Sequence, residues 1–181
     1  MNKPEDFNSD ELPEELKGDI LPEINPEKLF DENEYSTILI GKEGISKKDA
    51  NNSELLTILI SKKSTREDKD EALRELKDNN SQAFLINAIT NTKNVEQKTS
   101  LIASCWETGL DFSNYFTFFI DLICDKEFLI AFESFTVIQE MNTVINPDLL
   151  NSSLNKLKEY NHKNAIVNEA IQYIETILNS K

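Results

Sequence analysis

From about Ser64 to its C-terminus, the chain is a continuous series of amphipathic helix patterns. Each pattern is 10 to 18 residues long, and only two to five residues separate it from the next. Within each pattern, apolar residues recur at the spacing that places them on one face of an α-helix. The sequence therefore predicts an all-α fold in which short helices follow one another closely.

The distribution of glycine and proline supports this prediction. After Gly44 the chain contains only two such residues, Gly109 and Pro147. β-Hairpins need residues that tolerate a positive φ angle at their turns. A long stretch with so few of these residues favours helices over strands.

Local signals mark where individual helices begin and end. The segment Ser64-Thr65-Arg66-Glu67 is a candidate capping box, in which the serine and glutamate side chains each satisfy a free backbone amide. Asn94 and Asn146 are candidate N-caps, and Pro147 follows at the first helical position. Gly109 fits the left-handed position that ends a helix.

We expect consecutive helices to pair as hairpins. The expected pairs are 64–76 with 82–90, 94–108 with 115–123, and 126–141 with 147–160, and a last helix at 163–179 closes the array. The helix at 115–123 is apolar on almost every side, so we expect it at the centre of the core. The inward face of the helix at 126–141 is expected to comprise Phe128, Leu129, Phe132, Phe135 and Ile138.

The hairpins also recur at a regular interval. Leu73, Ile102 and Phe132 hold corresponding places in the first helix of each expected hairpin, at steps of 29 and 30 residues. Repeats of about 20 to 50 residues are typical of solenoids, whose units must stack to bury their apolar faces.

Three segments resemble repeats of the HEAT and armadillo-like α-solenoid family: REDKDEALREL at 66–76, NVEQKTSLIASCW at 94–106 and DLICDKEFLIAF at 121–132. The resemblance extends over about 64–180 and implies a short right-handed stack of antiparallel helical hairpins. The Asp and Arg ladder of HEAT units is incomplete, because Asn94 and Lys98 stand near those places in one unit and Asp125 has no arginine partner in the next. The period is also short for that family; tetratricopeptide repeats match it better, but their small residues and tryptophan are absent. A simple helical bundle stays open as an alternative.

The N-terminal part of the chain differs in composition. Residues 1–35 carry twelve carboxylates against three lysines, a net charge of −9, whereas the rest of the chain carries −5. High charge, several prolines and few apolar residues favour disorder. The sequence therefore predicts an acidic disordered tail at 1–35, a linker with a first short helix at 36–63, of which about 53–62 is helical, and a HEAT-like helical repeat domain at 64–181.

Charge and hydropathy limit the classes of partner. A negative chain repels phosphate backbones and anionic lipid surfaces, so we expect neither nucleic acid nor a membrane as partner. The start of the chain is acidic and polar, unlike a signal peptide, and its most apolar stretch, 115–123, is far shorter than the roughly 20 residues that span a bilayer. We expect a cytoplasmic protein whose oligomeric state is open.

The inventory of chemically active residues is small. His162 is the only histidine, and the sequence has no phosphate-binding glycine loop and no Cys-x-x-Cys pair. We therefore expect no catalytic residue, no metal site and no cofactor.

Two functional hypotheses of different class follow. The first is a non-enzymatic scaffold or adaptor that binds another protein, with candidate partner-binding residues Leu12, Leu21, Ile24, Trp106, Glu107 and Asp111. The alternative is an accessory or catalytic subunit that acts on a small molecule. Its site would combine the carboxylates of Glu107, Asp111 and Asp121 with aromatic residues around Trp106. A third idea is that the acidic segment 1–35 competes for a basic surface of a partner.

Overall fold

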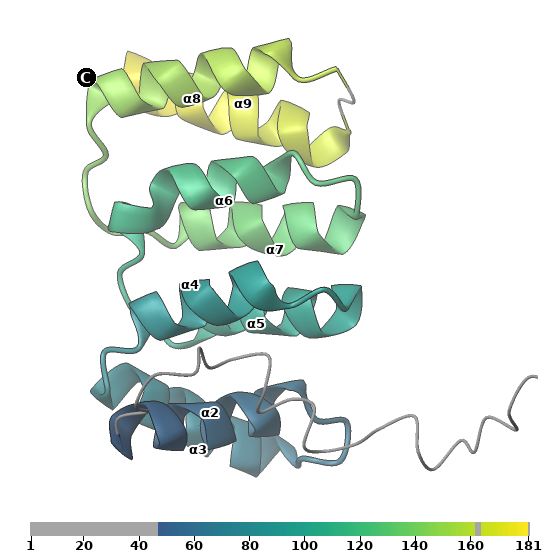
Figure 1. Cartoon of the computed structure of the whole chain (residues 1–181). Coiled ribbons are helices and arrows are strands. Elements are labelled where there is room, and N and C mark those ends of the chain that lie inside the picture. Colours follow the sequence, from purple (N-terminus) through teal and green to yellow (C-terminus); the bar gives the residue numbers. More distant parts are fainter. Residues whose placement is uncertain (1–46, 162–163, 181) are drawn as a thin grey trace, which may run out of the picture. The chain divides into compact units, whose positions relative to one another are not determined.

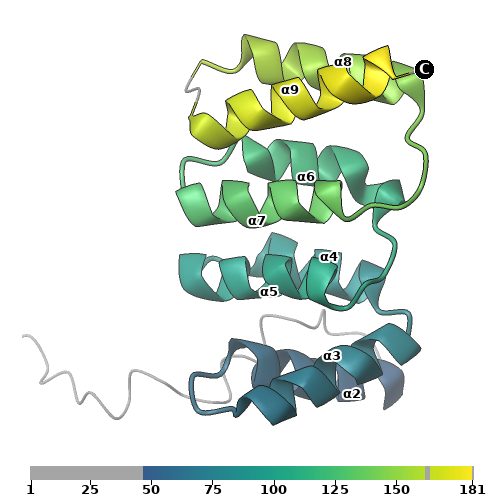
Figure 2. The same cartoon turned by 180° about the vertical axis from the view of Figure 1, so that it is seen from behind.

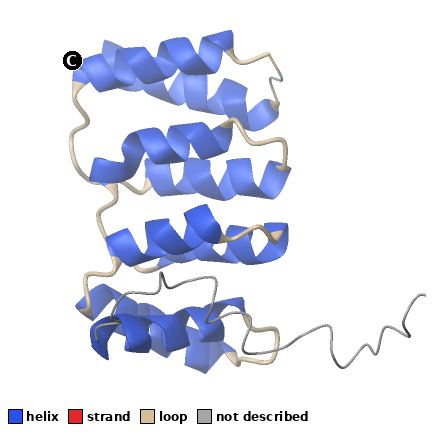
Figure 3. Cartoon of the chain, viewed as in Figure 1, coloured by secondary structure: helices blue, strands red, loops and turns tan. Residues whose placement is uncertain are grey.

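The computed structural model describes residues 47–161 and 164–180 (Figure 1). Within these residues every regular element is helical, as Figure 3 shows, so the predicted all-α class is confirmed there. The elements are α2 (Lys47–Ile60), α3 (Arg66–Asp78), α4 (Gln82–Asn91), α5 (Val95–Glu107), the 3₁₀ turn η4 (Ser113–Tyr115), α6 (Phe116–Ile123), α7 (Phe128–Gln139), α8 (Pro147–Glu159) and α9 (Ala165–Asn179). The prediction for 1–35 lies outside the described residues, as do Leu12, Leu21 and Ile24.

The described helices lie in two layers of one compact unit. Figure 1 shows α2, α4, α6 and α8 nearer the viewer, and we call them the first layer. Figure 2, from behind, shows α3, α5, α7 and α9 nearer, and we call them the second layer. Helix α2 packs on α3, α4 on α5, α6 on α7, and α8 on α9. Between these pairs, α7 packs on both α5 and α9, α2 on α5, and α6 on α8.

This pairing differs from the expected one by one helix. We expected α3 to pair with α4, α5 with α6, and α7 with α8, but none of these pairs packs extensively. The most extensive contact joins α5 to α7, followed by α6 with α7 and α2 with α3, and α5 packs equally on α2 and α4. The helix expected at 53–62 begins earlier, at Lys47, and supplies the first partner. Its Leu55, Leu56 and Leu59 belong to the same core as the helices that follow. Amphipathic patterns show that a helix needs neighbours, but they do not show on which side the neighbour lies.

The helix starts follow the local signals closely. Asn94 Oδ1 accepts a hydrogen bond from the backbone N–H of Gln97 at 3.0 Å, and Asn146 Oδ1 accepts one from Asp148 N–H at 2.8 Å. Pro147 is the first residue of α8, where its missing N–H leaves no donor unsatisfied. Both predicted caps are therefore confirmed.

The predicted capping box is displaced by one residue. Thr65, and not Ser64, is the N-cap of α3: its Oγ1 accepts from the backbone N–H of Asp68 at 3.2 Å. The Asp68 carboxylate accepts in return from the N–H of Thr65 at 2.9 Å. The motif is reciprocal, as predicted, but it uses an aspartate in place of Glu67.

Two residues with positive φ end helices of the second layer. Gly109, with φ of 61°, follows the C-cap of α5, as its position in the sequence predicts. Asn80 has φ of 50° after the end of α3, where asparagine takes the place that glycine usually holds. These turns let the chain pass from one pair of helices to the next with few glycines.

The core is continuous through all eight α-helices of the described residues. In α6, five of eight residues are buried, which agrees with the central place expected for 115–123. The prediction for α7 is wrong in part: Phe135 and Ile138 are buried, but Phe128, Leu129 and Phe132 are exposed. The inward face of α7 consists of Ile130, Ala131, Ser134, Phe135, Val137 and Ile138.

The wrong prediction for α7 is explained by the position of each residue relative to the start of its helix. Leu73 and Ile102 each stand seven residues after the first residue of α3 and α5, and in α7 that place belongs to Phe135. Phe132 stands only four residues after the start of α7. It is 43% exposed, whereas Phe135 is 5% exposed. The equivalence of Phe132 with Leu73 and Ile102 therefore fails.

The burial of these two phenylalanines provides a test. Phe135→Ala should lower the free energy of unfolding by about 3–5 kcal/mol, because it leaves a cavity in the core. Phe132→Ala should lower it by about 1 kcal/mol or less, because this ring is half in water. Urea denaturation of both variants measures the difference. Equal losses would contradict the placement of α7.

The displaced cap provides a second test. Thr65→Ala should lower the free energy of unfolding by about 1 kcal/mol, because it leaves the N–H of Asp68 without its acceptor. Ser64→Ala, the matched control, should change it by less than about 0.5 kcal/mol. Thermal unfolding followed by circular dichroism compares the two. A larger effect of Ser64→Ala would show that Ser64 is the cap.

Candidate functional site

Three large apolar side chains at the start of α7 are exposed to solvent. Phe128 is 54% exposed, Leu129 is 55% exposed, and Phe132 lies beside them. The rings of Phe128 and Phe132 are stacked, with centroids 6.1 Å apart and planes at 20°. We call these three residues the α7 cluster. A stacked pair of rings in water is unusual, because burying each ring would be favourable.

The neighbouring helix extends this apolar surface. Val95, the first residue of α5, is 42% exposed, and α5 packs along α7 in the same layer (Figure 2). Both helices begin at the same side of the layer. The first turns of α5 and α7 thus each expose apolar side chains at the same side of this layer.

The surface exists because α7 has more apolar residues than one face can hold. Its sequence, FLIAFESFTVIQ, has apolar residues on several sides, and its small residues Ala131 and Ser134 are fully buried. Small side chains allow helices to approach closely, so they occupy the face that packs against neighbours. Phe128, Leu129 and Phe132 remain on the other face. The small residues Ala131 and Ser134 were the signal in the sequence that could have predicted which face of α7 is buried.

Trp106, a predicted partner-binding residue, is half-buried near the C-terminal end of α5. Its indole N–H donates a hydrogen bond to Glu133 Oε2 of α7 at 2.8 Å. This bond joins adjacent helices of the second layer. Glu133 was not predicted from the sequence, because the contact connects residues 27 positions apart.

Glu107 lies beside this bond in an unfavourable electrostatic environment. Burial raises the pKa of its carboxyl group, and the carboxylates of Glu133 and Asp70 raise it further. Lys69 opposes them and lowers the pKa. Trp106 and Glu107 therefore share one region of the second layer, with Asp70 on one side and Glu133 on the other.

Asp111, another predicted partner-binding residue, joins two connecting segments. Its carboxylate accepts a hydrogen bond from Thr143 Oγ1 at 2.6 Å, and it also accepts from the backbone N–H and the hydroxyl of Ser113. The bonds from Thr143 and Ser113 lower the pKa of Asp111. Asp111 thus connects the segment after α5 to the segment between α7 and α8.

Asp121 belongs to the first layer. Its carboxylate pairs with Lys156, which joins α6 to α8 on the face that Figure 1 shows nearer. Glu107, Asp111 and Asp121 therefore have three separate sets of partners. In the described residues they form no group of three acidic side chains that could hold a metal ion.

The aromatic residues expected around Trp106 lie mainly in the core. Phe112 and Phe116 are buried, and the ring of Phe112 packs edge-on against Phe119 at 5.9 Å. Tyr115 is partly buried and packs beside Phe112 at 6.3 Å. These rings stabilise the α5–α6 turn and do not line a groove with Trp106.

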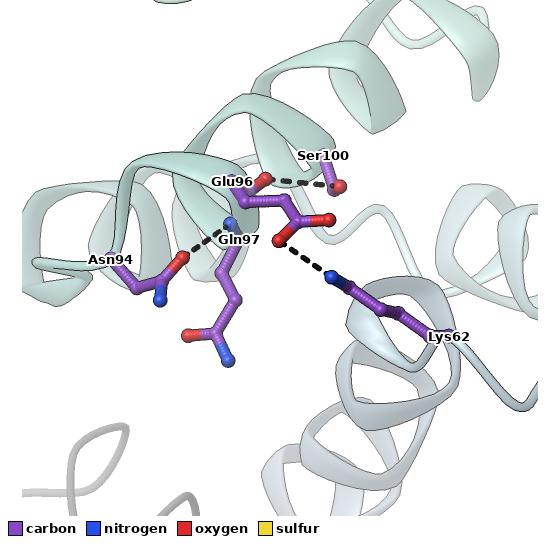
Figure 4. A network of polar contacts seen from close by, with 5 residues as sticks. All are labelled: Lys62, Asn94, Glu96, Gln97 and Ser100. Carbon is purple, nitrogen blue, oxygen red and sulfur yellow. Dashed lines mark hydrogen bonds and ion pairs between the residues drawn. The ribbon is translucent and has the colours of Figure 1, made fainter. Parts of the chain in front are cut away.

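A polar network joins the end of α2 to the start of α5 (Figure 4). Lys62 Nζ and Glu96 Oε2 form an ion pair at 2.9 Å, and Asn94 caps the same turn. Both side chains of the pair are largely in water, so the pair contributes about 0–1 kcal/mol. The network helps to orient α5 and Val95 but offers no buried polar site.

No group of three or more His, Cys, Asp or Glu side chains in the described residues is arranged to hold a metal ion. His162 lies outside those residues. No helix in the same part of the chain is long and apolar enough to cross a membrane.

Comparison of the chain with protein-family models, with curated proteins and with solved structures found no match.

The environment of Glu107 predicts a pH-dependent stability. Its folded-state pKa lies above the ordinary value of 4.5, so the ionised carboxylate destabilises the fold only above that pH. Glu107→Gln should therefore raise the free energy of unfolding near neutral pH, by no more than about 0.5 kcal/mol at this partly exposed site. The gain should disappear as the pH falls below 4.5.

Urea denaturation followed by the fluorescence of Trp106, the only tryptophan, measures this effect. High salt should reduce the gain near neutral pH, because it screens the repulsion from Glu133 and Asp70. If Glu107→Gln raised the free energy of unfolding equally near neutral pH and below pH 4.5, this would contradict the electrostatic explanation.

Proposed function

We propose that this protein is a non-enzymatic interaction module that binds another protein through the second layer of its helical array. The α7 cluster carries the proposal. Exposed apolar side chains that lie together on a surface are a recurrent mark of protein interaction sites. Aromatic residues are also the side chains that most often dominate binding energy at such sites.

The position of the cluster supports this proposal. It lies at the start of α7, where its three side chains are exposed, and α5, which packs on α7, exposes Val95 in its own first turn. Trp106, Glu107 and Glu133 lie on the same two helices, closer to the C-terminal end of α5. An interface centred on Phe128 and Phe132 would therefore have an apolar middle and charged residues at one border, as protein interfaces usually do.

The arrangement of the helices is the second support. We propose that the chain is a short α-solenoid of the HEAT-like kind, in which α2/α3, α4/α5, α6/α7 and α8/α9 are the stacked hairpins. Neighbouring pairs touch through α5 with α7 and α7 with α9, as nearest-neighbour contacts in a solenoid do. Solenoids present one continuous layer of helices to a partner, and here that layer would be α3, α5, α7 and α9.

The alternative of a small-molecule site at Glu107, Asp111 and Asp121 is less well supported. Asp111 binds Thr143 and Ser113, and Asp121 pairs with Lys156 of the first layer. An acid/base pair needs its two carboxylates within reach of one substrate. We therefore retain the interaction module as the proposed function.

Affinity capture from the native cell, with quantitative mass spectrometry, tests the proposal. The double variant Phe128→Ser/Phe132→Ser should remain folded, because both rings are exposed. It should lose a specific captured protein by about tenfold or more, as expected when a central aromatic contact worth about 1.4 kcal/mol is removed.

Val144→Ser is the matched control, because Val144 is exposed and lies outside the α7 cluster. It should capture the same protein as the unmodified chain. If no captured protein depends on Phe128 and Phe132, the α7 cluster is not the binding surface.

A further inference from the structure

Charge is divided unequally between the two layers of helices. The helices of the second layer contain eleven acidic and five basic residues, a net charge of −6. Those of the first layer contain five acidic and four basic residues, a net charge of −1. None of the charged side chains of the second layer is buried. The layer that Figure 2 shows nearer therefore presents most of the negative charge of the helices.

The helices around the α7 cluster have few basic residues. α7 and α9 contain none, and α5 contains one, Lys98. The residues directly before α7, 125–127, are two carboxylates and one lysine. Glu133 stands four residues after Leu129 and one after Phe132, so it lies on the helix surface at the edge of the cluster. The α7 cluster thus combines exposed apolar side chains with an acidic border.

The negative charge of this border is only partly balanced within the chain. The hydrogen bond from the indole of Trp106 holds the Glu133 carboxylate near Glu107. Burial raises the pKa of the Glu107 carboxyl group, and the carboxylates of Glu133 and Asp70 raise it further, whereas Lys69 lowers it. Because the carboxylates repel one another, a positive group of a partner placed beside them would be stabilised.

The other end of α7 is different. There the segment that joins α7 to α8 borders a pocket of about 160 Å³ that is open to solvent. Its lining residues carry no charge and include the buried Ile138 and Leu150. The pocket is thus separate from the α7 cluster and its acidic border.

Charge distinguishes between the possible occupants of the α7 cluster. A second copy of the chain would bring another acidic layer, and the chain's own segment 1–35 has a net charge of −9, so both would be repelled. Nucleic acids and anionic lipid surfaces would be repelled as well. An uncharged apolar partner would remove water from the acidic border without pairing it. A partner with basic residues beside its apolar ones meets neither cost.

We propose that the α7 cluster binds a basic amphipathic segment of another protein. The apolar side chains of this segment pack on the rings of Phe128 and Phe132, and its lysine or arginine side chains pair with Glu133 and Glu107. The contact has an apolar centre and a charged rim, as protein interfaces commonly do. This inference rests on the proposed function and adds the chemistry of the partner.

Three synthetic peptides test the inference by titration calorimetry with the full chain. The first is an amphipathic helix with leucine on one face and lysine on the other. The second has glutamate at each lysine position, and the third has serine at each leucine position. The first peptide should bind at least about tenfold more tightly than either of the others. Its affinity should fall as the salt concentration rises, because salt screens the charge attraction.

Variants of the chain locate the binding surface. Phe128→Ser/Phe132→Ser should weaken binding of the lysine peptide by about tenfold or more. Glu133→Gln keeps an oxygen acceptor for Trp106 but removes the charge, and it should weaken binding by about twofold to fivefold. Glu54→Gln, the matched control, removes the same charge from an exposed position of α2 in the first layer and should leave binding unchanged. Thermal unfolding verifies that each variant is folded.

Three results would overturn the inference. The first is that the lysine peptide does not bind, and the second is that Glu54→Gln weakens its binding as much as Glu133→Gln does. The third is that the glutamate peptide binds at least as tightly as the lysine peptide. If Phe128→Ser/Phe132→Ser then weakens binding of the glutamate peptide, the proposed function stands and only the charge of the partner is wrong. The proposed function fails separately, when no captured protein depends on Phe128 and Phe132.

Discussion

The structure depends on the burial of helix faces between neighbours on two sides at once. No helix here is long enough to be stable alone in water, so each must pack its apolar face to remain folded. α7 shows this most clearly, because it contacts α6 of its own pair and α5 and α9 of the adjacent pairs. Its buried small residues, Ala131 and Ser134, permit that close approach. This packing sets the orientation of α7, and the orientation decides which of its side chains remain exposed.

The α7 cluster and the pocket are both consequences of that packing. α7 has apolar residues on several sides, and once one face is used for the core, Phe128, Leu129 and Phe132 remain in water. At the other end of the same helix, the chain crosses from α7 to α8, and this connection borders a small open pocket between the helices. The two features differ in kind. The cluster is an exposed apolar surface, whereas the pocket is a small recess that is open to solvent.

The sequence predicted the local features well and the pairwise contacts poorly. The caps at Asn94 and Asn146 and the left-handed Gly109 were predicted because each depends on residues within one turn of the chain. The cap of α3 was placed one residue early, since Ser64 and Thr65 have equivalent hydroxyl groups. In the candidate site, Trp106 and Glu107 were identified as neighbours along the chain, but the bond from Trp106 to Glu133 was not. The contact of Asp111 with Thr143 was not predicted for the same reason, since the two residues are 32 positions apart.

The sequence by itself determined the all-α class, the approximate positions of the helices after Ser64 and the residues that start and end most of them. These properties follow from backbone hydrogen bonds and side chains that are close in sequence. Only the tertiary structure decided which helices pair, which face of α7 is buried, and which carboxylates meet. An apolar stripe requires a partner but does not specify it, and a helix that is apolar on several sides can be rotated without breaking its pattern. Which helices pair, and which face of each is buried, depends on the fit of side chains across helices. That fit involves residues that are distant in the chain.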